Sequence, residues 1–339
     1  MNIDTKDISF IIQGELKSDI YQKTTENIRQ FFPNAEIVLA SYTGTDTTGL
    51  DYDQCILIED PGFYYYSNKK NSKINNINRQ IQTTLNGLKI ATRKYAFKVR
   101  SDFIINGSDF IKYFNKFSES DPKYKIFEKK ILASVFFSRD PRKKERPLPF
   151  HPSDIAFFGL RTDLLNLFDI PLMPKEEVHY YEFKNILNCR YVPEQYLWIN
   201  CLRNNGKYIQ CDYKWDCNDH IAEETERYIV SNFIYLEYEQ FNLIPPRKLR
   251  LFVENDFDSV ITHIEWQKLY KQYVNYAHEV PEIDIVRNEI DHKLKLSKNL
   301  TKLAKYLVAL IPLSVVRRSF RSKLTKYLLK DIQLGSVEK

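Results

Sequence analysis

Short apolar runs alternate with helical patterns over the first 110 residues, and this alternation constrains the fold more than any other feature of the sequence. Four runs have the length and composition of buried strands: residues 8–13, 36–40, 55–58 and 95–99. Helical patterns lie between them at about 19–32 and 75–91, and another helical pattern starts near Ser108. Strands that are separated by helices indicate a mostly parallel sheet with helices on both faces, which is an α/β fold.

The pattern continues less regularly in the second half of the chain. Residues 131–137 and 155–159 are typical of strands, and a helix opens at Pro193 and extends to about residue 202. Residues 203–251 are rich in aromatic side chains and do not predict one type of element. No repeat or low-complexity linker interrupts this stretch.

We therefore expect a single domain over residues 1–251. A helical connecting segment over 252–292 and a basic amphipathic helical tail over 293–334 complete the predicted organisation. Because ligands of such sheets bind at the carboxyl ends of the strands, four loops are candidate positions for a site. They follow Gln13, Ala40, Ile58 and Val99.

Composition and missing motifs exclude several classes of protein. With 43% hydrophobic and 28% charged residues, the chain is typical of a globular protein and not of a disordered one. Its five cysteines form no CxxC pair, which disfavours a zinc ribbon and favours reduced thiols in the cytoplasm. No GxSxG, Walker A, GxGxxG or HxxxH motif occurs, so serine hydrolases, P-loop NTPases and Rossmann-type dinucleotide enzymes have no support. The N-terminal segment does not predict a signal peptide.

The positive charge is concentrated in the tail. Residues 293–330 carry eleven Lys or Arg and no Asp or Glu, whereas residues 1–292 carry 38 basic and 42 acidic side chains. The longest uncharged apolar run in the tail, 306–316, has eleven residues, and a spanning helix needs about twenty. The tail is therefore predicted to lie on an anionic membrane surface, with an apolar face toward the lipid. The cations expected to contact the headgroups are Lys302, Lys305, Arg317, Arg318 and Arg321. The alternative is a helical hairpin that packs on the core.

The segment Lys98–Asp102 (KVRSD) stands just after a predicted central strand. An acidic residue flanked by cations suits a diphosphate with its divalent metal, with Asp102 as the metal ligand and Lys98 and Arg100 near the phosphates. In the alternative interpretation, Asp102 pairs with Arg100 or caps a loop.

A polar cluster begins the helix at residues 75–80. Asn75, Asn78 and Arg79 could bind a base, a ribose or a phosphate at the helix N-terminus. The cluster could equally be a helix cap with an exposed polar face. The neighbouring turn at Asp60 is a second candidate contact or a simple turn.

Two acidic residues are candidate catalytic groups. Glu194 lies in the first turn of the helix that Pro193 opens, and an apolar face behind it fixes its orientation, so it is a candidate general base. A Glu there could also simply complement the helix dipole. Asp154, just before the strand 155–159, is a second candidate for the base or for an acceptor contact, or else belongs to a turn that enters the strand.

Seven of these segments, taken in order, resemble the WavE family of lipopolysaccharide-synthesis proteins over about residues 8–251. The matching segments are ISFIIQG (8–14), FPNAEIVLASYTG (32–44), EDPG (59–62), NNINRQI (75–81), FKVRSD (97–102), HPSDIAFFG (151–159) and PEQYLW (193–198). The resemblance implies a glycosyltransferase of the GT-A type, with a Rossmann-like sheet that binds a nucleotide-sugar. It also implies sugar transfer during the assembly of a cell-surface glycan (lipopolysaccharide, O-antigen or capsule).

The resemblance assigns roles to several residues. Asp102 stands where GT-A enzymes place the metal motif Asp-x-Asp, but position 100 is Arg, so Mg²⁺ or Mn²⁺ would have one carboxylate and the cations would share the diphosphate. Glu194 stands where inverting members place the base. Gln13, Gly14 and Asp60 are expected to contact the nucleotide. The expected acceptor is a lipid-linked or free oligosaccharide at the cytoplasmic face of the membrane.

Two other classes of function fit parts of the sequence. A sugar nucleotidyltransferase uses a similar sheet, but the loop after the first strand lacks the Gly- and Lys-rich pattern of a triphosphate site. A non-catalytic basic adaptor for nucleic acid would use the same cations, yet these are confined to the tail. We therefore expect no nucleic-acid partner.

Overall fold

The computed structural model describes residues 3–70, 72–142, 147–246, 249, 259–282, 284 and 285. It divides into two compact units, Met1–Glu279 and Val280–Lys339, and every element below lies in the first. The cations assigned to a membrane, Lys302, Lys305, Arg317, Arg318 and Arg321, lie outside the described residues.

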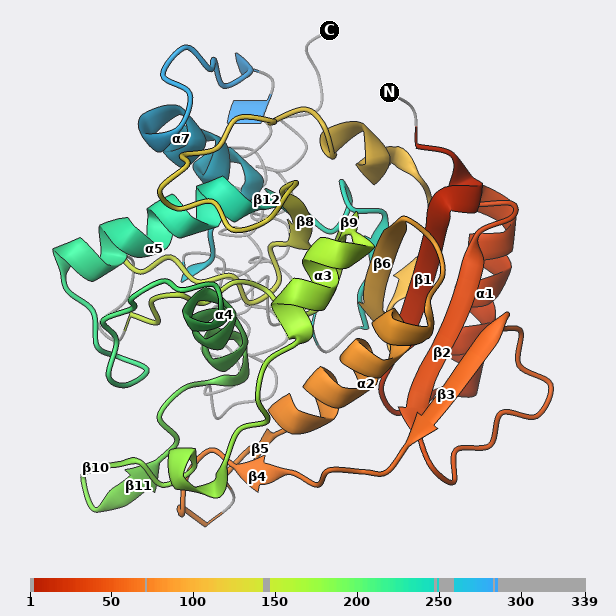
Figure 1. Ribbon diagram of the computed structural model, residues 1–339, viewed down its shortest axis with the longest axis horizontal. Helices are drawn as coiled ribbons and strands as arrows, with labels where there is room; N and C mark the ends of the chain where they lie inside the picture. The colour runs from red at the N-terminus through yellow and green to blue at the C-terminus, as the bar shows by residue number, and fades with distance from the viewer. Residues whose placement is uncertain are drawn as a thin grey trace, which may run out of the picture. The chain divides into compact units, whose positions relative to one another are not determined.

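A seven-stranded sheet with the order β12-β8-β9-β6-β1-β2-β3 runs through the first unit (Figure 1). Its strands are β1 (Ile8–Gln13), β2 (Glu36–Tyr42), β3 (Gln54–Ile58), β6 (Tyr95–Arg100), β8 (Ile131–Ser134), β9 (Ala156–Leu160) and β12 (Phe233–Leu236). Strand β9 runs antiparallel to both its neighbours, and the other strands run in one common direction. The carboxyl ends of those strands and the amino end of β9 therefore meet at one edge, called the carboxyl edge below.

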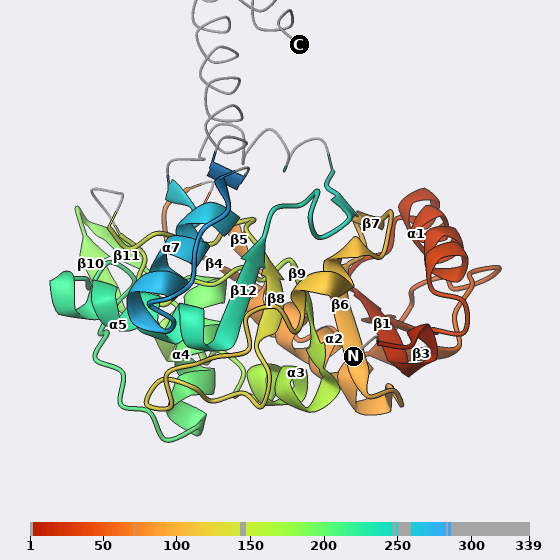
Figure 2. The ribbon, with the colours of Figure 1, turned by 90° about the horizontal axis from the view of Figure 1, so that it is seen from above.

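Six α-helices are described in this unit: α1 (Ser18–Phe31), α2 (Ile77–Ile90), α3 (Arg161–Phe168), α4 (Pro193–Asn204), α5 (Asp219–Asn232) and α7 (His263–Tyr273). Short 3₁₀ helices are η1 (Thr5–Asp7), η2 (Asp109–Tyr113) and η3 (Lys175–Glu177). Helices α2 and α3 pack on one face of the sheet, and α1 lies on the opposite face (Figure 2).

The strands are buried because both faces of the sheet are covered. On one face, Phe10 of β1 and Phe97 of β6 stack with 5.4 Å between ring centroids. On the other face, Ile11 of β1 and Ala40 of β2 lie directly under Gly87 of α2, where an added Cβ would meet them at 2.7 and 3.0 Å. The missing side chain lets α2 approach the sheet closely.

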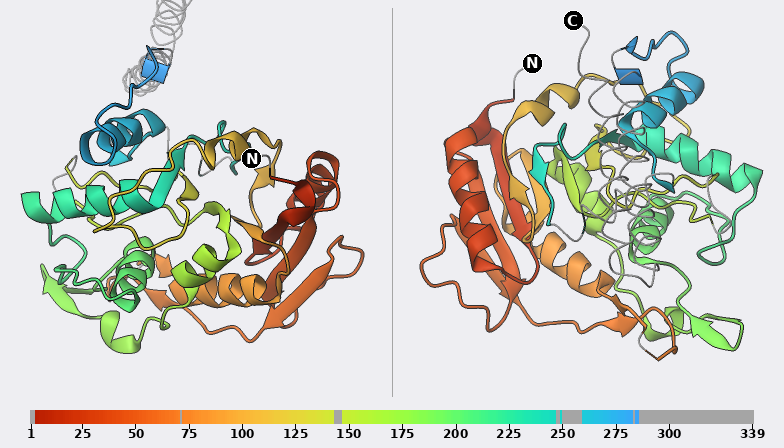
Figure 3. Two further views of the ribbon diagram at one scale, coloured as in Figure 1. Left: turned by 45° about the horizontal axis from the view of Figure 1, so that its top comes forward. Right: turned by 180° about the vertical axis from the view of Figure 1, so that it is seen from behind.

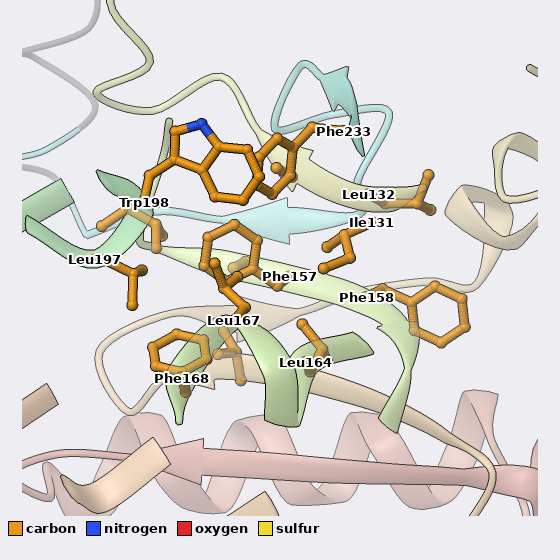
Figure 4. Close-up of a cluster of buried hydrophobic side chains, with 14 of the residues drawn as sticks. Ile131, Leu132, Phe157, Phe158, Leu164, Leu167, Phe168, Leu197, Trp198 and Phe233 are labelled. Carbon is orange, nitrogen blue, oxygen red and sulfur yellow. The ribbon is translucent and has the colours of Figure 1, made fainter. Parts of the chain in front are cut away.

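The second half of the sheet has an aromatic core between β9, α3 and α4 (Figure 4). Trp198 of α4 packs edge-on against Phe233 of β12 at 4.8 Å, and Phe157 of β9 packs against Phe168 of α3 at 6.0 Å. All four side chains are completely buried. This core fixes α4, whose first turn projects to the carboxyl edge.

Three pairs of short strands lie outside the main sheet: β4 (Tyr64–Tyr65) with β5 (Ile74–Asn75), β10 (Tyr181–Phe183) with β11 (Ile186–Asn188), and β7 (Ile104–Ile105) with β13 (Leu243–Ile244). The first two pairs lie side by side (Figure 3), joined by a bridge between Ser67 and Asn188 and by a hydrogen bond from the Cys189 amide to the Tyr66 carbonyl of 2.9 Å.

The predicted α/β fold with a mostly parallel central sheet is confirmed. The strand at residues 8–13 has the predicted bounds, whereas the helix expected from Ser108 is only the 3₁₀ turn η2. The ambiguous stretch 203–251 contains α5, β12 and β13. Helix α7, in the segment predicted as a connection, packs against α5 and β12 within the first unit, which extends to Glu279.

Candidate functional site

The ends of β1 and β6 form the centre of the carboxyl edge. Gln13 and Arg100 are neighbours in the pairing of these two strands, and the Ser101 amide donates to the Gln13 carbonyl at 3.0 Å. Gly14 follows with a φ of 106°, which the chain needs for the turn from β1 toward α1. Its amide still bonds to the Ala40 carbonyl at 3.1 Å.

Asp60 and Arg79 bind one another at the end of β3. The Arg79 guanidinium donates to both carboxylate oxygens of Asp60, and the Nε–Oδ1 distance is 2.7 Å. This ion pair holds the pKa of the Asp60 carboxyl below its usual value. The guanidinium also lies 4.9 Å from the centroid of the Phe63 ring. Since the side chain of Asp60 is 42% exposed and that of Arg79 25%, a bound ligand can reach both.

Thr83 ties the first turns of α2 to β1. Its hydroxyl lies 2.8 Å from Gln13 Oε1 and 2.8 Å from the carbonyl oxygen of Arg79. Tyr42, at the end of β2, lies beside Arg79, and burial raises the pKa of its phenol to about 12 although Arg79 opposes this shift. The structure therefore brings Gln13, Arg79 and Asp60 to one side of the carboxyl edge.

The two predicted asparagines face the interior. Asn78 exchanges two hydrogen bonds with the backbone of Met173, at 2.7 and 3.1 Å. Asn75 accepts from the Ile77 amide at 3.1 Å and so caps the first turn of α2. Both side chains are buried, so they affect donor binding only by holding α2 in position.

Asp102 and Arg100 form the ion pair that the sequence left as an alternative. Arg100 Nε and Nη2 donate to the two oxygens of Asp102 at 3.0 and 2.7 Å. Both oxygens are thus occupied by a cation. Among the described residues, no three His, Cys, Asp or Glu side chains lie close enough to hold a metal ion. The donor set around Asp102 does not fit a metal bound by the protein alone.

Lys98 lies beneath the site and not in it. The side chain is completely buried, and its ammonium donates to the carbonyls of Asp154 and Ile155 and faces the rings of Phe157 and Phe168 at 5.8 and 5.7 Å. Burial lowers the pKa of Lys98 to about 7. The ammonium therefore fixes the segment that carries Asp154.

The two predicted catalytic acids influence one another electrostatically at the carboxyl edge. Burial raises the pKa of the Glu194 carboxyl well above its usual value, and the Asp154 carboxylate raises it further. Arg139 and Arg100 act in the opposite direction on the same group. One acid and two arginines, from three other segments of the chain, thus act electrostatically on Glu194.

His151 lies closest to Glu194, with 3.5 Å between His151 Nε2 and Glu194 Oε2. The side chains are 4% and 13% exposed, and burial lowers the pKa of His151 to about 3. The imidazole is therefore neutral near pH 7, and the contact is not an ion pair. Within the described part of the chain, the buried Nδ1 atom has no hydrogen-bond partner.

Sequence reasoning missed His151, Tyr66 and Arg139. Burial, Glu194 and Asp154 raise the pKa of the Tyr66 phenol, so its hydroxyl lies within electrostatic reach of both acids. Two signals were present: His151 stands three residues before Asp154, and Tyr66 ends a run of three tyrosines. Neither signal says which distant segment the side chain meets.

Within the residues that the structure describes, no helix has both the length and the apolar composition needed to cross a bilayer.

Comparison with known proteins gives one family. A family model described as WavE lipopolysaccharide synthesis matches residues 8–299. The match extends past the resemblance at residues 8–251 and includes the first residues of the basic tail. No curated protein matches the chain.

Proposed function

The chain belongs to the WavE lipopolysaccharide synthesis family, and from this premise we propose that it is a glycosyltransferase of the GT-A type. It moves a sugar from a nucleotide-sugar donor to a growing cell-surface glycan. The observation that carries this proposal is the buried Glu194 carboxyl at the carboxyl edge of a mostly parallel sheet, 3.5 Å from His151 and under the electrostatic influence of Asp154 and Arg100. This edge is where such sheets bind nucleotides.

The donor lies along the ends of β1, β3 and β6. Its nucleotide contacts Gln13, Gly14 and Asp60, and its diphosphate approaches Arg79 and Arg100. Each arginine holds a carboxylate in the structure, so a phosphate that takes over the guanidinium exchanges one bidentate anion for another. The guanidinium needs no new orientation for this exchange.

The reaction is a single in-line displacement with inversion at the anomeric carbon. The acceptor hydroxyl oxygen forms the new glycosidic bond, and the bond from the anomeric carbon to the diphosphate oxygen breaks. Glu194 takes the hydroxyl proton. The departing diphosphate oxygen keeps the electron pair of the broken bond, and Arg100 and Arg79 stabilise its negative charge. Burial and the Asp154 carboxylate increase the proton affinity of Glu194, which makes it a stronger base once it is ionised.

A divalent cation enters this proposal only with the donor. Mg²⁺ or Mn²⁺ bound to the diphosphate would meet one protein carboxylate, Asp102, which must first leave Arg100. The arginines therefore carry the diphosphate charge in the proposal, and no step depends on the metal.

We also propose that the enzyme works at the cytoplasmic face of the membrane, where lipid-linked acceptors are found. The support is the sequence of residues 293–330, with eleven cations and no acid.

The test measures nucleotide release from a panel of nucleotide-sugars, with and without an oligosaccharide acceptor. Glu194→Gln keeps the shape of the side chain but removes the base, so transfer should fall roughly 10²–10⁴-fold while donor binding persists. Glu223→Gln is the matched control, because Glu223 lies on α5 in a surface ion pair with Arg227.

Loss of donor binding in Glu194→Gln would show a structural or donor-contact role in place of a base. Turnover of nucleoside triphosphates with sugar phosphates, and none of nucleotide-sugars, would show a nucleotidyltransferase and overturn the proposal.

A further inference from the structure

Four aromatic side chains gather beside the first turn of α4. Tyr181 and Phe183 come from β10, and Tyr213 and Trp215 come from the loop after α4. Tyr181 lies 5.1 Å from Tyr213 and 6.0 Å from Trp215, and Phe183 lies 5.8 Å from Trp215, measured between ring centroids. These four residues are called the aromatic surface below.

The aromatic surface is partly exposed, and polar groups lie among its rings. Phe183 and Tyr213 are each 37% exposed, and Trp215 is half-buried. The Lys214 ammonium lies 4.6 Å from the Trp215 ring centroid and 3.5 Å from Asn188 Oδ1. At the tip of the hairpin, Lys184 places its ammonium 5.5 Å from the Phe183 ring.

The aromatic surface is attached to the catalytic end of α4. Gln195, the residue after Glu194, is completely buried and donates to the Lys214 carbonyl at 3.0 Å and to the Pro149 carbonyl at 2.7 Å. On the other side, Lys214 donates its amide to the Arg190 carbonyl at 2.7 Å, just before α4 begins. The loop that carries Tyr213 and Trp215 is thus held at the first turn of α4 by the Gln195 side chain and by the backbone of Arg190.

We infer that the aromatic surface binds the pyranose rings of the oligosaccharide acceptor. This inference rests on the proposed function, because the acceptor hydroxyl must come within reach of Glu194. A pyranose has apolar C–H faces and hydroxyls around its edge. Broad amphipathic rings with ammonium and amide groups between them complement both features at a low cost in side-chain entropy.

Two other ligands fit the aromatic surface less well. A lipid chain would cover the exposed Lys184 ammonium beside Phe183 without replacing its hydration. A nucleobase also stacks on aromatic rings, but the proposed donor groups Arg79 and Asp60 lie by the end of β3, beside the exposed ring of Phe63. The aromatic surface therefore belongs to the acceptor.

Tryptophan fluorescence tests this inference without turnover. Trp198 and Trp266 are completely buried and Trp215 is half-buried, so a ligand on the aromatic surface changes mainly the Trp215 emission. The probe is the water-soluble core oligosaccharide released from lipopolysaccharide by mild acid. Titration of the full chain should give a saturable change. Tyr213→Ala and Phe183→Ala should each raise the dissociation constant by ~10-fold.

The matched control is Tyr208→Ala, because Tyr208 follows the same helix and is 84% exposed but lies outside the aromatic surface. It should leave the dissociation constant unchanged, and Tyr213→Phe should restore most of the affinity. The denaturation midpoint of each variant verifies that it is folded. The rate at which the enzyme hydrolyses the donor without an acceptor should be the same in all of these variants.

The outcomes separate the two proposals. If the wild-type emission does not respond to the oligosaccharide, or if Tyr208→Ala weakens binding as much as Tyr213→Ala, the acceptor assignment is wrong. If the oligosaccharide binds the aromatic surface but no nucleotide-sugar is turned over, the proposed function fails and the binding surface stands.

Discussion

The proton affinity of Glu194 controls how the proposed reaction depends on pH. A base must be ionised to act, and burial together with Asp154 raises the pKa of this carboxyl well above its usual value. The rise of kcat/KM with pH should therefore lie above the range of an ordinary glutamate, near 4.3. His151 does not contribute to this rise, because its pKa is about 3.

The measurement is kcat/KM from pH 4 to 9 for the wild type and for Asp154→Asn. Removal of the neighbouring carboxylate should move the rise toward lower pH, but only in part, since burial is the larger cause of the shift. Glu223→Gln should leave the profile in place. An identical profile in Asp154→Asn would show that Asp154 does not raise the pKa of Glu194.

The sequence predicted some residues of the candidate site and not others. Asp154 and Glu194 were predicted because each stands at the start of an element with an apolar pattern, so the position relative to the sheet follows from the periodicity. Tyr66 and His151 were not, because their meeting with Glu194 depends on contacts between segments up to 128 residues apart. The sequence predicted that Asn78 contacts the donor, but its side-chain amide forms hydrogen bonds with the backbone of Met173 inside the protein.

At the scale of elements, α2 depends on one glycine for its distance from the sheet. An alanine at Gly87 would place its Cβ 2.7 Å from Ile11 Cγ2, in a fully buried and branched side chain that cannot move aside. The helix propensity of alanine favours the change by about 1 kcal/mol, whereas overpacking of a core costs about 1–3 kcal/mol. The cost of the steric clash should therefore exceed the gain in helix propensity.

We therefore expect Gly87→Ala to lower the free energy of unfolding and to weaken donor binding, because α2 also carries Arg79. Chemical denaturation measures the first effect and a thermal-shift titration with nucleotide-sugars the second. Lys89→Ala, on the exposed side of the same helix, should change neither. A more stable Gly87→Ala protein would show that α2 can shift outward at no cost.

The strands of the first half could be predicted well because each is a short apolar run between strong helical patterns. The reversal of β9 could not, since strand direction depends on the long connection from residue 135 to 155 and not on the composition of the strand. Helix α5 and strand β12 could not be told apart in the sequence, because the apolar residues Tyr228, Ile229 and Val230 of the helix lie only two residues before the apolar β12.

At the scale of the whole molecule, the charges are divided between a slightly acidic body and a basic tail. Each cation near an anionic bilayer contributes about 1 kcal/mol to binding, so three charge reversals are a severe change. The triple variant Arg317→Glu, Arg318→Glu, Arg321→Glu should bind phosphatidylserine vesicles at least ~100-fold more weakly at low salt. Its hydrolysis of the donor should be normal.

Vesicle sedimentation measures this effect, with reversal of the exposed lysines Lys17, Lys23 and Lys89 as the control of equal charge. Added salt should weaken binding of the wild type without abolishing it, since salt does not screen apolar burial. A wild-type chain that ignores anionic vesicles at low salt would refute membrane association.

The antiparallel strand β9 also has a consequence for the chain while it is being synthesised. Strand β6 gains its second neighbour only when β9, 55 residues further along, has emerged from the ribosome. Until then β6 is a free edge of the half-made sheet, and free edges recruit strands from other molecules. Lys98, which later donates to the Asp154 carbonyl, is at that stage a hydrated charge on this edge.

An inward-pointing charge is one of the means by which sheets avoid edge-to-edge aggregation. We expect Lys98→Met to scatter more light than Lys89→Met when each is diluted from denaturant at rising protein concentration. Equal scattering would mean that the edge needs no protection. We therefore expect Lys98 to protect the nascent sheet before it fixes the segment that carries Asp154.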